Sequence, residues 1–197
     1  MQGTHFLNIC DIMPHEAKKL AWQAEEKMKK FFAVLVILFA AAFVFAEETG
    51  YIVKFDTKDM KGNPVTSAIF AESKITMINI WGTFCGPCIR EMPDLGKLAQ
   101  ENKKRGVQII GIPIDVVDWR GNIVARTKAD GDTIIEQTGA NYTHLIPTRD
   151  MLNGFLNGVQ VVPTTFFVDS TGKVVGKAYM GSTTKEEWQK KIDELIK

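Results

Sequence analysis

Two cysteines separated by two residues offer the clearest chemistry in this 197-residue sequence. Cys85 and Cys88 lie in the stretch WGTFCGPCIREMP, behind an apolar run and ahead of a helical pattern. Such a pair can serve as a redox couple, as half of a zinc site or as a structural disulfide. A zinc site needs about four ligands, and His144 is the one histidine in the same part of the chain. A disulfide that closes so short a loop adds little stability, so the spacing favours redox chemistry.

The segments on either side of the pair predict how it is held. Residues 75–81 and 107–114 are short apolar runs rich in β-branched residues, which are typical of strands buried inside a sheet. Between them we predict a helix that ends at Gly106. Its apolar face consists of Ile89, Met92, Leu95 and Ala99. A strand, a helix and a strand in this order predict parallel strands joined by a right-handed crossover, with the cysteines at the strand-to-helix turn. There, backbone N–H groups and the helix dipole stabilise a thiolate.

A hairpin and a helix are predicted at the end of the chain. The strand-like runs 164–169 and 173–180 are separated by a Ser-Thr-Gly turn, which favours a hairpin. Thr184 and Glu187 then form a capping box at the start of the last helix. The apolar face of that helix comprises Trp188, Ile192, Leu195 and Ile196.

The segment between the second strand and the hairpin, residues 115–160, is less regular. Two short helices are predicted in it, at residues 132–139 and 150–158. Each begins at an aspartate, which is a favourable helix cap, and ends at a glycine.

The first part of the chain has the pattern of an export signal. Residues 28–46 begin with Met-Lys-Lys and end on a small residue, around the charge-free apolar run 31–45. That run of fifteen residues is short for a membrane span, and an uncleaved anchor is the alternative to a cleaved signal peptide. Either one places residues 47–197 outside the cytoplasm, in the periplasm or on the outer face of the cytoplasmic membrane. Residues 1–27 form a mixed-charge extension ahead of this signal, which favours a true start at Met28.

Composition and charge fit one globular domain with appendages. Hydrophobic residues make up 45% and charged residues 24% of the chain, which places it outside the disordered class. Three cysteines are too few for a fold held together by disulfides. Residues 47–197 carry equal numbers of acidic and basic side chains, so there is no basic field that would attract nucleic acid.

The cysteine motif resembles the active-site signature of the thioredoxin superfamily. Its pattern W-x-x-x-C-x-P-C-x-x-E-x-P is most similar to that of the extracytoplasmic TlpA-like and ResA-like proteins. The matching residues are Trp81, Cys85, Pro87, Cys88, Glu91 and Pro93. A second motif, Val162-Pro163 followed by Thr-Thr-Phe, resembles the cis-proline loop that faces the cysteines in this superfamily.

This resemblance covers about residues 52–197. It implies an α/β, thioredoxin-like fold in which a central mixed β-sheet is flanked by helices. Residues 115–160 would be an insertion before the cis-proline loop. The thioredoxin-like domain is accordingly expected to span residues 47–197.

The resemblance also implies a thiol-disulfide oxidoreductase that reduces disulfides of extracytoplasmic proteins. Cys85 would be the attacking thiolate and Cys88 the resolving thiol, while Val162 and Pro163 would bind an extended substrate segment. The residues implied to shape the site are Trp81, Gly86, Pro87, Glu91 and Pro93. No cofactor or metal is implied. The implied partners are protein disulfide substrates such as apocytochrome c, and an electron donor such as a membrane thiol-disulfide transporter.

Two other function classes stay open. A thiol peroxidase of the peroxiredoxin branch shares the fold, but its pattern has threonine three residues before the reactive cysteine, where Gly82 stands. A non-enzymatic copper-binding chaperone has three residues between its cysteines and a distal histidine. Here two residues separate the cysteines, and His144 would have to be that histidine.

The proton acceptor for Cys88 is unassigned. Thioredoxin has a buried aspartate six residues before its first cysteine, and Asn79 occupies that position here. ResA-like proteins are similar in having asparagine there and use a glutamate in the inserted region, whose comparable position is Val116. The neighbouring Asp115 and Asp118 are predicted to cap or solvate the loop.

Three structural expectations complete the site. Glu91 matches the family pattern, and its alternative role is that of a first-turn acid that the helix dipole favours. His144 is predicted to be a surface or partly buried residue rather than a catalytic one. The Val162-Pro163 peptide bond is predicted to be cis and to face Cys85.

Overall fold

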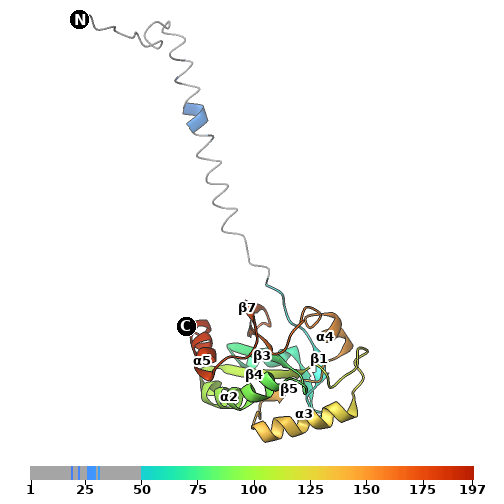
Figure 1. Cartoon of the computed structure of the whole chain (residues 1–197). Coiled ribbons are helices and arrows are strands. Elements are labelled where there is room, and N and C mark those ends of the chain that lie inside the picture. Colours follow the sequence, from blue (N-terminus) through green and yellow to red (C-terminus); the bar gives the residue numbers. More distant parts are fainter. Residues whose placement is uncertain (1–18, 20–21, 23–25, 30, 32–49) are drawn as a thin grey trace, which may run out of the picture. The chain divides into compact units, whose positions relative to one another are not determined.

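The structure is a computed structural model that describes residues 19, 22, 26–29, 31 and 50–197 (Figure 1). The chain divides into two units, residues 1–49 and 50–197, and in the first unit residues 26–29 are helical. Most of the predicted signal segment and of the extension before it lies outside the described residues, so both stay predictions. Within the described part of the chain, no helix combines the length and the apolar character needed to cross a membrane.

A five-stranded mixed sheet in the order β5-β4-β3-β6-β7 forms the centre of the second unit. Its strands are β3 (Ile75–Trp81), β4 (Val107–Pro113), β5 (Thr143–His144), β6 (Thr164–Asp169) and β7 (Val174–Met180). Strands β3, β4 and β5 run parallel, whereas β6 is antiparallel to both β3 and β7. The predicted crossover and the predicted hairpin are therefore confirmed. Every residue of β3 is buried, as a central strand covered on both faces requires.

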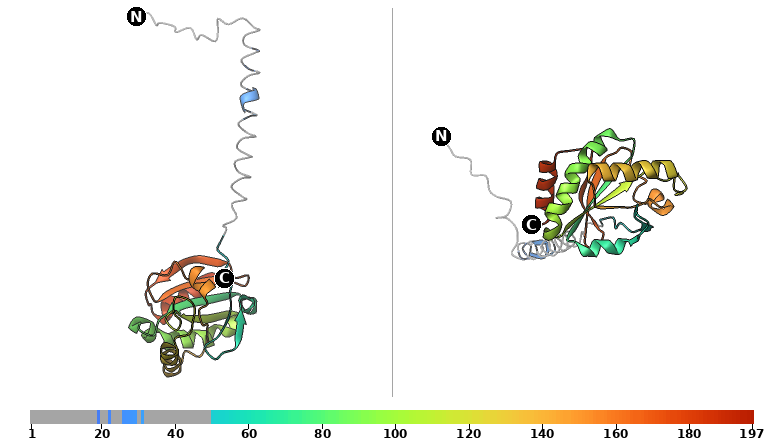
Figure 2. Two further views of the ribbon diagram at one scale, coloured as in Figure 1. Left: turned by 90° about the vertical axis from the view of Figure 1, so that its right-hand side faces the viewer. Right: turned by 90° about the horizontal axis from the view of Figure 1, so that it is seen from below.

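The two faces of the sheet are covered by different elements (Figure 2). Ile78 and Ile80 point to one face, where they pack with Phe70 of the 3-10 helix η2 (Ser67–Glu72) and with Met151 of α4 (Arg149–Asn153). Figure 2 shows α2 and α5 together on the opposite side of the sheet from η2. A small hairpin of β1 (Asp56–Lys58) and β2 (Pro64–Thr66) forms a separate two-stranded sheet. Backbone hydrogen bonds join it to the end of β5, where the Met60 N–H donates to the His144 carbonyl and the Ile146 N–H donates to the Lys58 carbonyl.

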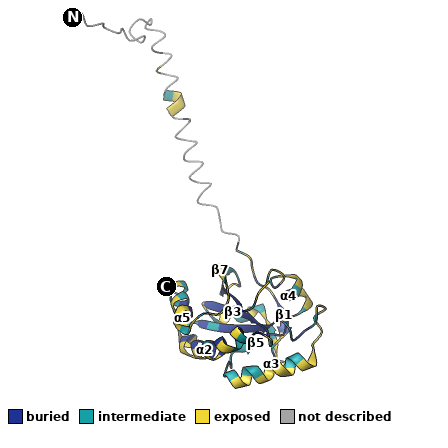
Figure 3. Cartoon of the chain, viewed as in Figure 1, coloured by how far each residue is buried: buried dark blue, intermediate teal, exposed yellow. Residues whose placement is uncertain are grey.

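Helix α2 (Gly86–Asn102) carries the cysteine motif and packs on the second face of the sheet. Its Leu95 and Leu98 join Met77 of β3 in one buried cluster. A short 3-10 turn, η3 (Lys103–Arg105), continues it to Gly106, whose φ of 83° is the left-handed conformation that ends helices. Figure 3 shows the central strands around β3 in dark blue, above α2 in that view.

Helix α2 approaches the end of α3 (Ala125–Thr138) very closely. A side chain at Gly96 would place its Cβ 2.6 Å from the carbonyl oxygen of Gly139, so the contact depends on glycine at this position of the helix. The backbone that leads from α3 into β5 is thereby held against the redox helix.

The last helix, α5 (Lys185–Leu195), packs beside α2. The side chain of Thr184 accepts a hydrogen bond from the Glu187 N–H at 3.3 Å, which is half of the predicted capping box. Trp188 and Ile192 are buried in the cluster below α2, as the apolar spacing predicted.

The two helices predicted in the insertion are placed differently. Helix α3 begins at Ala125 and not at Asp132. Its N-cap residue, Val124, makes no side-chain cap hydrogen bond. Asp132 lies inside the helix, where it pairs with Lys128 one turn earlier. Helix α4 is capped by Thr148 rather than by Asp150 and ends at Gly154, four residues before the predicted stop. The predicted stop at Gly139 is confirmed, because this glycine is the C-cap of α3, whereas both aspartate caps and the stop at Gly158 were wrong.

Candidate active site

The two motif cysteines form a disulfide at the first turn of α2. Strand β3 ends at Trp81, and a turn in which the Cys85 N–H donates to the Gly82 carbonyl at 3.0 Å leads into the helix. Cys85 is the N-cap residue, and its Sγ accepts a hydrogen bond from the Cys88 N–H at 3.2 Å. The predicted strand-to-helix position is confirmed, and a thiolate on Cys85 would face the positive end of the helix dipole.

The predicted cis-proline loop lies against this pair. The Val162-Pro163 peptide bond is cis, and the Val162 carbonyl oxygen is 3.6 Å from Cys85 Sγ. The Pro163 carbonyl accepts a hydrogen bond from the Gly181 N–H at 2.8 Å, which anchors the loop beside the end of β7. Two motifs far apart in the sequence therefore meet at one edge of the sheet.

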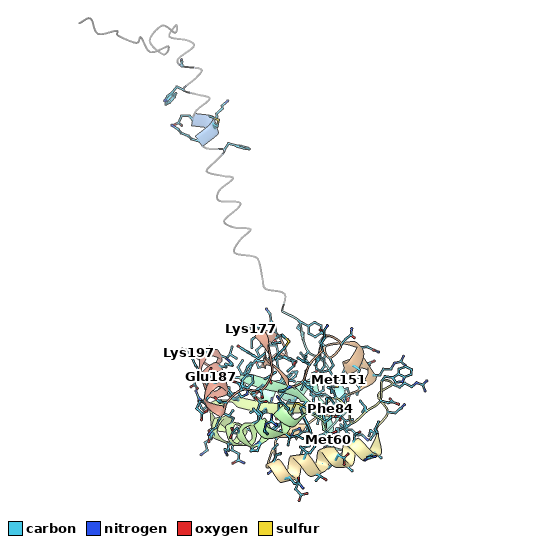
Figure 4. The ribbon with its side chains drawn as sticks, viewed as in Figure 1. Met60, Phe84, Met151, Lys177, Glu187 and Lys197 are labelled. Atoms are coloured by element: carbon cyan, nitrogen blue, oxygen red, sulfur yellow. A yellow bond between two sulfur atoms is a disulfide. The ribbon has the colours of Figure 1, made fainter. Side chains whose placement is uncertain are left out.

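The side chains around the motif differ in exposure. Phe84, labelled in Figure 4, directly precedes the disulfide and is 70% exposed. Its ring lies so close to Gly82 that a Cβ there would be 2.7 Å from it. Pro87 occupies the first turn of α2 with an exposed side chain, where its missing N–H costs nothing. Pro93 lies inside α2 and is also exposed.

Asp115 connects the insertion to the motif, a role that the sequence did not reveal. Its carboxylate accepts hydrogen bonds from the Thr83 backbone N–H at 3.0 Å and from the Thr83 hydroxyl. Its own carbonyl accepts a hydrogen bond from Thr127 of α3 at 2.8 Å. The expectation that Asp115 merely caps or solvates its loop was wrong. Its place two residues after β4, at the same sheet edge as the end of the parallel strand β3, could have indicated the contact.

Asp118 does cap its own loop. Its carboxylate accepts hydrogen bonds from the backbone N–H groups of Arg120 and Asn122 and from the Asn122 side chain. These hydrogen bonds, first among them that from the Asn122 side chain, lower the pKa of Asp118. Asp118 thus stabilises the loop and remains ionised.

Neither Asn79 nor Val116, the two positions considered for the acceptor of the Cys88 proton, carries an acid. Asn79 is buried, and its side-chain amide donates to the Thr165 hydroxyl at 3.0 Å. Val116 is fully buried in an apolar cluster with Met60 and Ile146. Amide, hydroxyl and aliphatic groups do not take up a thiol proton near neutral pH.

Glu91 is the buried carboxylate of α2. It is 5% exposed, and its Oε1 accepts hydrogen bonds from Trp188 Nε1 at 2.7 Å and from the Thr183 backbone N–H at 2.8 Å. Since α2 begins at Gly86, Glu91 lies in the second turn, and the first-turn expectation was wrong.

The burial of Glu91 changes its ionisation. Loss of solvent raises its pKa above the ordinary value of 4.5, and the hydrogen bonds from Thr183 and Trp188 oppose this shift without cancelling it. The neighbouring Asp94 raises the pKa further. Glu91 is consequently an acid that can hold a proton at a higher pH than an exposed glutamate does.

His144 is buried rather than lying at the surface, with an exposed fraction of 3%. Burial lowers its pKa to about 4, so the imidazole is neutral at physiological pH. One ring nitrogen bonds to Trp81 Nε1 and the other to the Ala140 carbonyl. Both nitrogens are engaged, which disfavours the copper-ligand role that the chaperone alternative requires.

The class of protein follows from this fold and from the comparisons. Residues 51–177, which are more than half of the chain, match the AhpC/TSA family. The chain therefore belongs to that family. A thiol:disulfide interchange protein of the thioredoxin family from Chlorobium tepidum has the same fold. It superimposes with a TM-score of 0.62 at 22% identity, over 76% of this chain and 97% of its own.

Two relatives indicate the kind of reaction that proteins similar to this chain carry out. The thiol-disulfide oxidoreductase ResA of Geobacillus thermodenitrificans is 30% identical over 174 residues, which are 82% of this chain and 92% of that protein. The thiol:disulfide interchange protein HelX of Rhodobacter capsulatus is 32% identical over 133 residues, which are 68% of this chain and 67% of that protein. The chain is thus a thiol-disulfide oxidoreductase with a thioredoxin-like fold, as its motifs predicted.

Proposed function

We propose that this chain reduces disulfides of proteins outside the cytoplasm, through Cys85 and Cys88. The observation that carries the proposal is the position of the Cys85 sulfur, which is at the N-terminus of α2 and 3.6 Å from the Val162 carbonyl. An extended substrate that pairs with the Val162 backbone would bring its own disulfide against that sulfur.

The first step is attack by Cys85. Its thiolate, stabilised by the helix terminus and the Cys88 N–H, attacks one sulfur of the substrate disulfide. The substrate S–S bond breaks as a bond between Cys85 and the substrate forms. The other substrate sulfur leaves as a thiolate and takes up a proton.

The second step releases the substrate. Cys88 loses its proton, attacks Cys85 Sγ and forms the Cys85–Cys88 disulfide, while the second substrate sulfur leaves as a thiolate. Two electrons have then passed from the protein dithiol to the substrate. An electron donor must return two electrons to the pair before another turnover, and a membrane thiol-disulfide transporter would be such a donor.

Glu91 is the acceptor that we assign to the Cys88 proton. It follows Cys88 by three residues, so both side chains lie on one buried face of α2. Its raised pKa brings it closer to that of a thiol, which makes proton transfer less unfavourable than with an exposed carboxylate. The shaping roles of Trp81, Gly86 and Pro87 belong to the same proposal.

The substrate side of the site is the loop that Val162 and Pro163 form. Pro163 offers no N–H, so backbone pairing with a substrate falls to Val162. Unfolded proteins with reactive disulfides fit such a site, and apocytochrome c is the specific substrate that we propose.

The proposed direction makes the redox potential the decisive measurement. The oxidant DsbA has a potential of about −120 mV because its reduced form is stabilised, whereas the reductant thioredoxin lies near about −270 mV. Cys85 is 5% exposed, so its thiolate gains little from water. Equilibration with glutathione buffers is expected to give a value nearer to that of thioredoxin. A value near that of DsbA would overturn the direction and leave dithiol exchange intact.

Export is proposed for residues 47–197, on the basis of the signal pattern in residues 28–46. Expression of the full sequence in a bacterium is expected to yield exported protein that begins at Glu47, and intact-mass analysis can identify it. Changing Ala46 to a bulky residue should block this cleavage and serves as the control. Cytoplasmic protein that retains Met1 would contradict the proposal.

A further inference from the structure

His144 lies outside the cysteine motif, and its buried imidazole makes two hydrogen bonds and a ring-stacking contact. The indole N–H of Trp81 donates to its Nδ1 at 3.2 Å, and its Nε2 is 2.9 Å from the Ala140 carbonyl oxygen. An indole nitrogen is a donor and a carbonyl oxygen is an acceptor. These two partners therefore assign the proton to Nε2, and they leave Nδ1 unprotonated so that its lone pair accepts the hydrogen bond from Trp81.

The neighbouring strand and the ring of Tyr142 shape a slot for this imidazole. Gly111 of β4 lies opposite His144 in the sheet, and a Cβ there would be 2.2 Å from Nδ1. Tyr142 stacks on the imidazole, with ring centroids 4.4 Å apart and planes inclined by 26°. A residue larger than glycine at position 111 would therefore collide with the imidazole. Gly111 and Tyr142 together hold the imidazole in one orientation.

The other end of this hydrogen bond reaches the redox pair. Trp81 is fully buried, and it packs in one cluster with Cys85, Cys88 and Met92. The indole is therefore a wall of the cysteine site, and the hydrogen bond to His144 fixes its plane.

We infer that His144 is a positioning residue, which holds the Trp81 indole against Cys85 and Cys88 and thereby biases the pair toward its disulfide form. A fixed apolar wall keeps water from the sulfur atoms, and this destabilises the thiolate of the reduced pair. If the wall loosens, water stabilises the thiolate and the dithiol form is favoured. This inference deepens the proposed redox function and rests on it.

The test is the equilibrium between the protein and glutathione. Protein dithiol and oxidised glutathione give protein disulfide and two molecules of reduced glutathione. In the full chain, His144→Leu is expected to shift this equilibrium about tenfold toward the dithiol, which corresponds to about 30 mV more positive. His144→Asn keeps an acceptor oxygen near the position of Nδ1, and it is expected to restore most of the unsubstituted value.

A double-mutant cycle with Trp81→Phe separates positioning from general stability. Phenylalanine keeps an aromatic wall but has no N–H to donate. In that background His144→Leu should change the equilibrium by less than about twofold, because the interaction has already been removed. Trp119→Phe, at a tryptophan that is 72% exposed, is the control for aromatic substitution and should leave the equilibrium unchanged. Equal effects of His144→Leu in both backgrounds would overturn the inference.

A measurement on the unsubstituted protein covers the case in which His144→Leu does not fold. The ¹⁵N chemical shifts of the imidazole report which nitrogen carries the proton, and Nδ1 is expected to be unprotonated. A proton on Nδ1 would exclude the hydrogen bond from Trp81 and overturn the inference. A potential like that of DsbA would instead overturn the proposed direction, while the dependence on Trp81 would still be measurable.

Discussion

The Cys88→Ser variant is expected to accumulate as mixed disulfides with its substrates, whereas Cys85→Ser should lose disulfide reduction altogether. The difference follows from the geometry. Cys85 Sγ lies at the helix N-terminus beside the Val162 carbonyl. Cys88 is 1% exposed, so it reacts only with the mixed disulfide that Cys85 has formed with a substrate. Without Cys85 there is no attacking thiolate, and the rate should fall by about three orders of magnitude or more.

Non-reducing electrophoresis with mass spectrometry of the trapped species, together with a disulfide-reduction assay, distinguishes the two variants. The unsubstituted protein, prepared and assayed in the same way, is the control. Full turnover by Cys88→Ser with no trapped substrate would show that a second thiol is not needed, and the dithiol mechanism would be wrong.

Replacing Glu91 by glutamine is expected to slow disulfide exchange by about 100-fold while the protein stays folded. The amide oxygen can still accept the hydrogen bonds from Trp188 and Thr183, so the free energy of unfolding should change by less than about 1 kcal/mol. Glu91→Leu instead leaves both buried donors without an acceptor, which should cost about 2 to 4 kcal/mol. Stopped-flow kinetics and urea unfolding measure the two effects separately.

The pH dependence of stability gives an independent signature of Glu91. Its pKa is raised in the folded protein, so between 4.5 and that raised value the unfolded chain ionises more readily than the folded one. The stability contributed by the neutral carboxyl is complete below pH 4.5 and is lost as the pH rises through the raised pKa. Glu91→Gln should remove this loss. Glu101→Gln is the control, at an acid of the same helix whose side chain is 50% exposed and pairs with Lys185, and it should leave this loss of stability in place. If the exchange rate of Glu91→Gln were unchanged, another group would have to accept the Cys88 proton.

The sequence predicted those parts of the structure that depend on local pattern. The apolar run and burial of residues 75–81, the helical spacing after Cys88 and the turn of the last hairpin follow from short stretches of sequence, and the structure confirms them. The cis bond before Pro163 was predictable because the V-P-T-T run follows a recognisable cysteine motif.

The contacts of Glu91 and His144 could not be read from their surroundings in the sequence. Each depends on a partner brought near by the fold: Trp188 lies 97 residues after Glu91, and Trp81 lies 63 residues before His144. A polar side chain beside apolar residues looks the same in a sequence whether it faces water or a buried donor. For His144, the pairing of β5 with β4 decides that the side chain is buried, because it places the imidazole against Gly111.

The bond between Thr83 and Asp115 bears on how modular this enzyme is. Thr83 lies two positions before Cys85, and Asp115 is the second residue after β4. The backbone N–H and the hydroxyl of Thr83 donate to the Asp115 carboxylate and so join the two segments. A protein engineer who transplanted residues 115–160 into another protein of this fold would have to carry the threonine across as well. The turn that precedes Cys85 and the insertion are therefore better regarded as one exchangeable unit than as two independent parts.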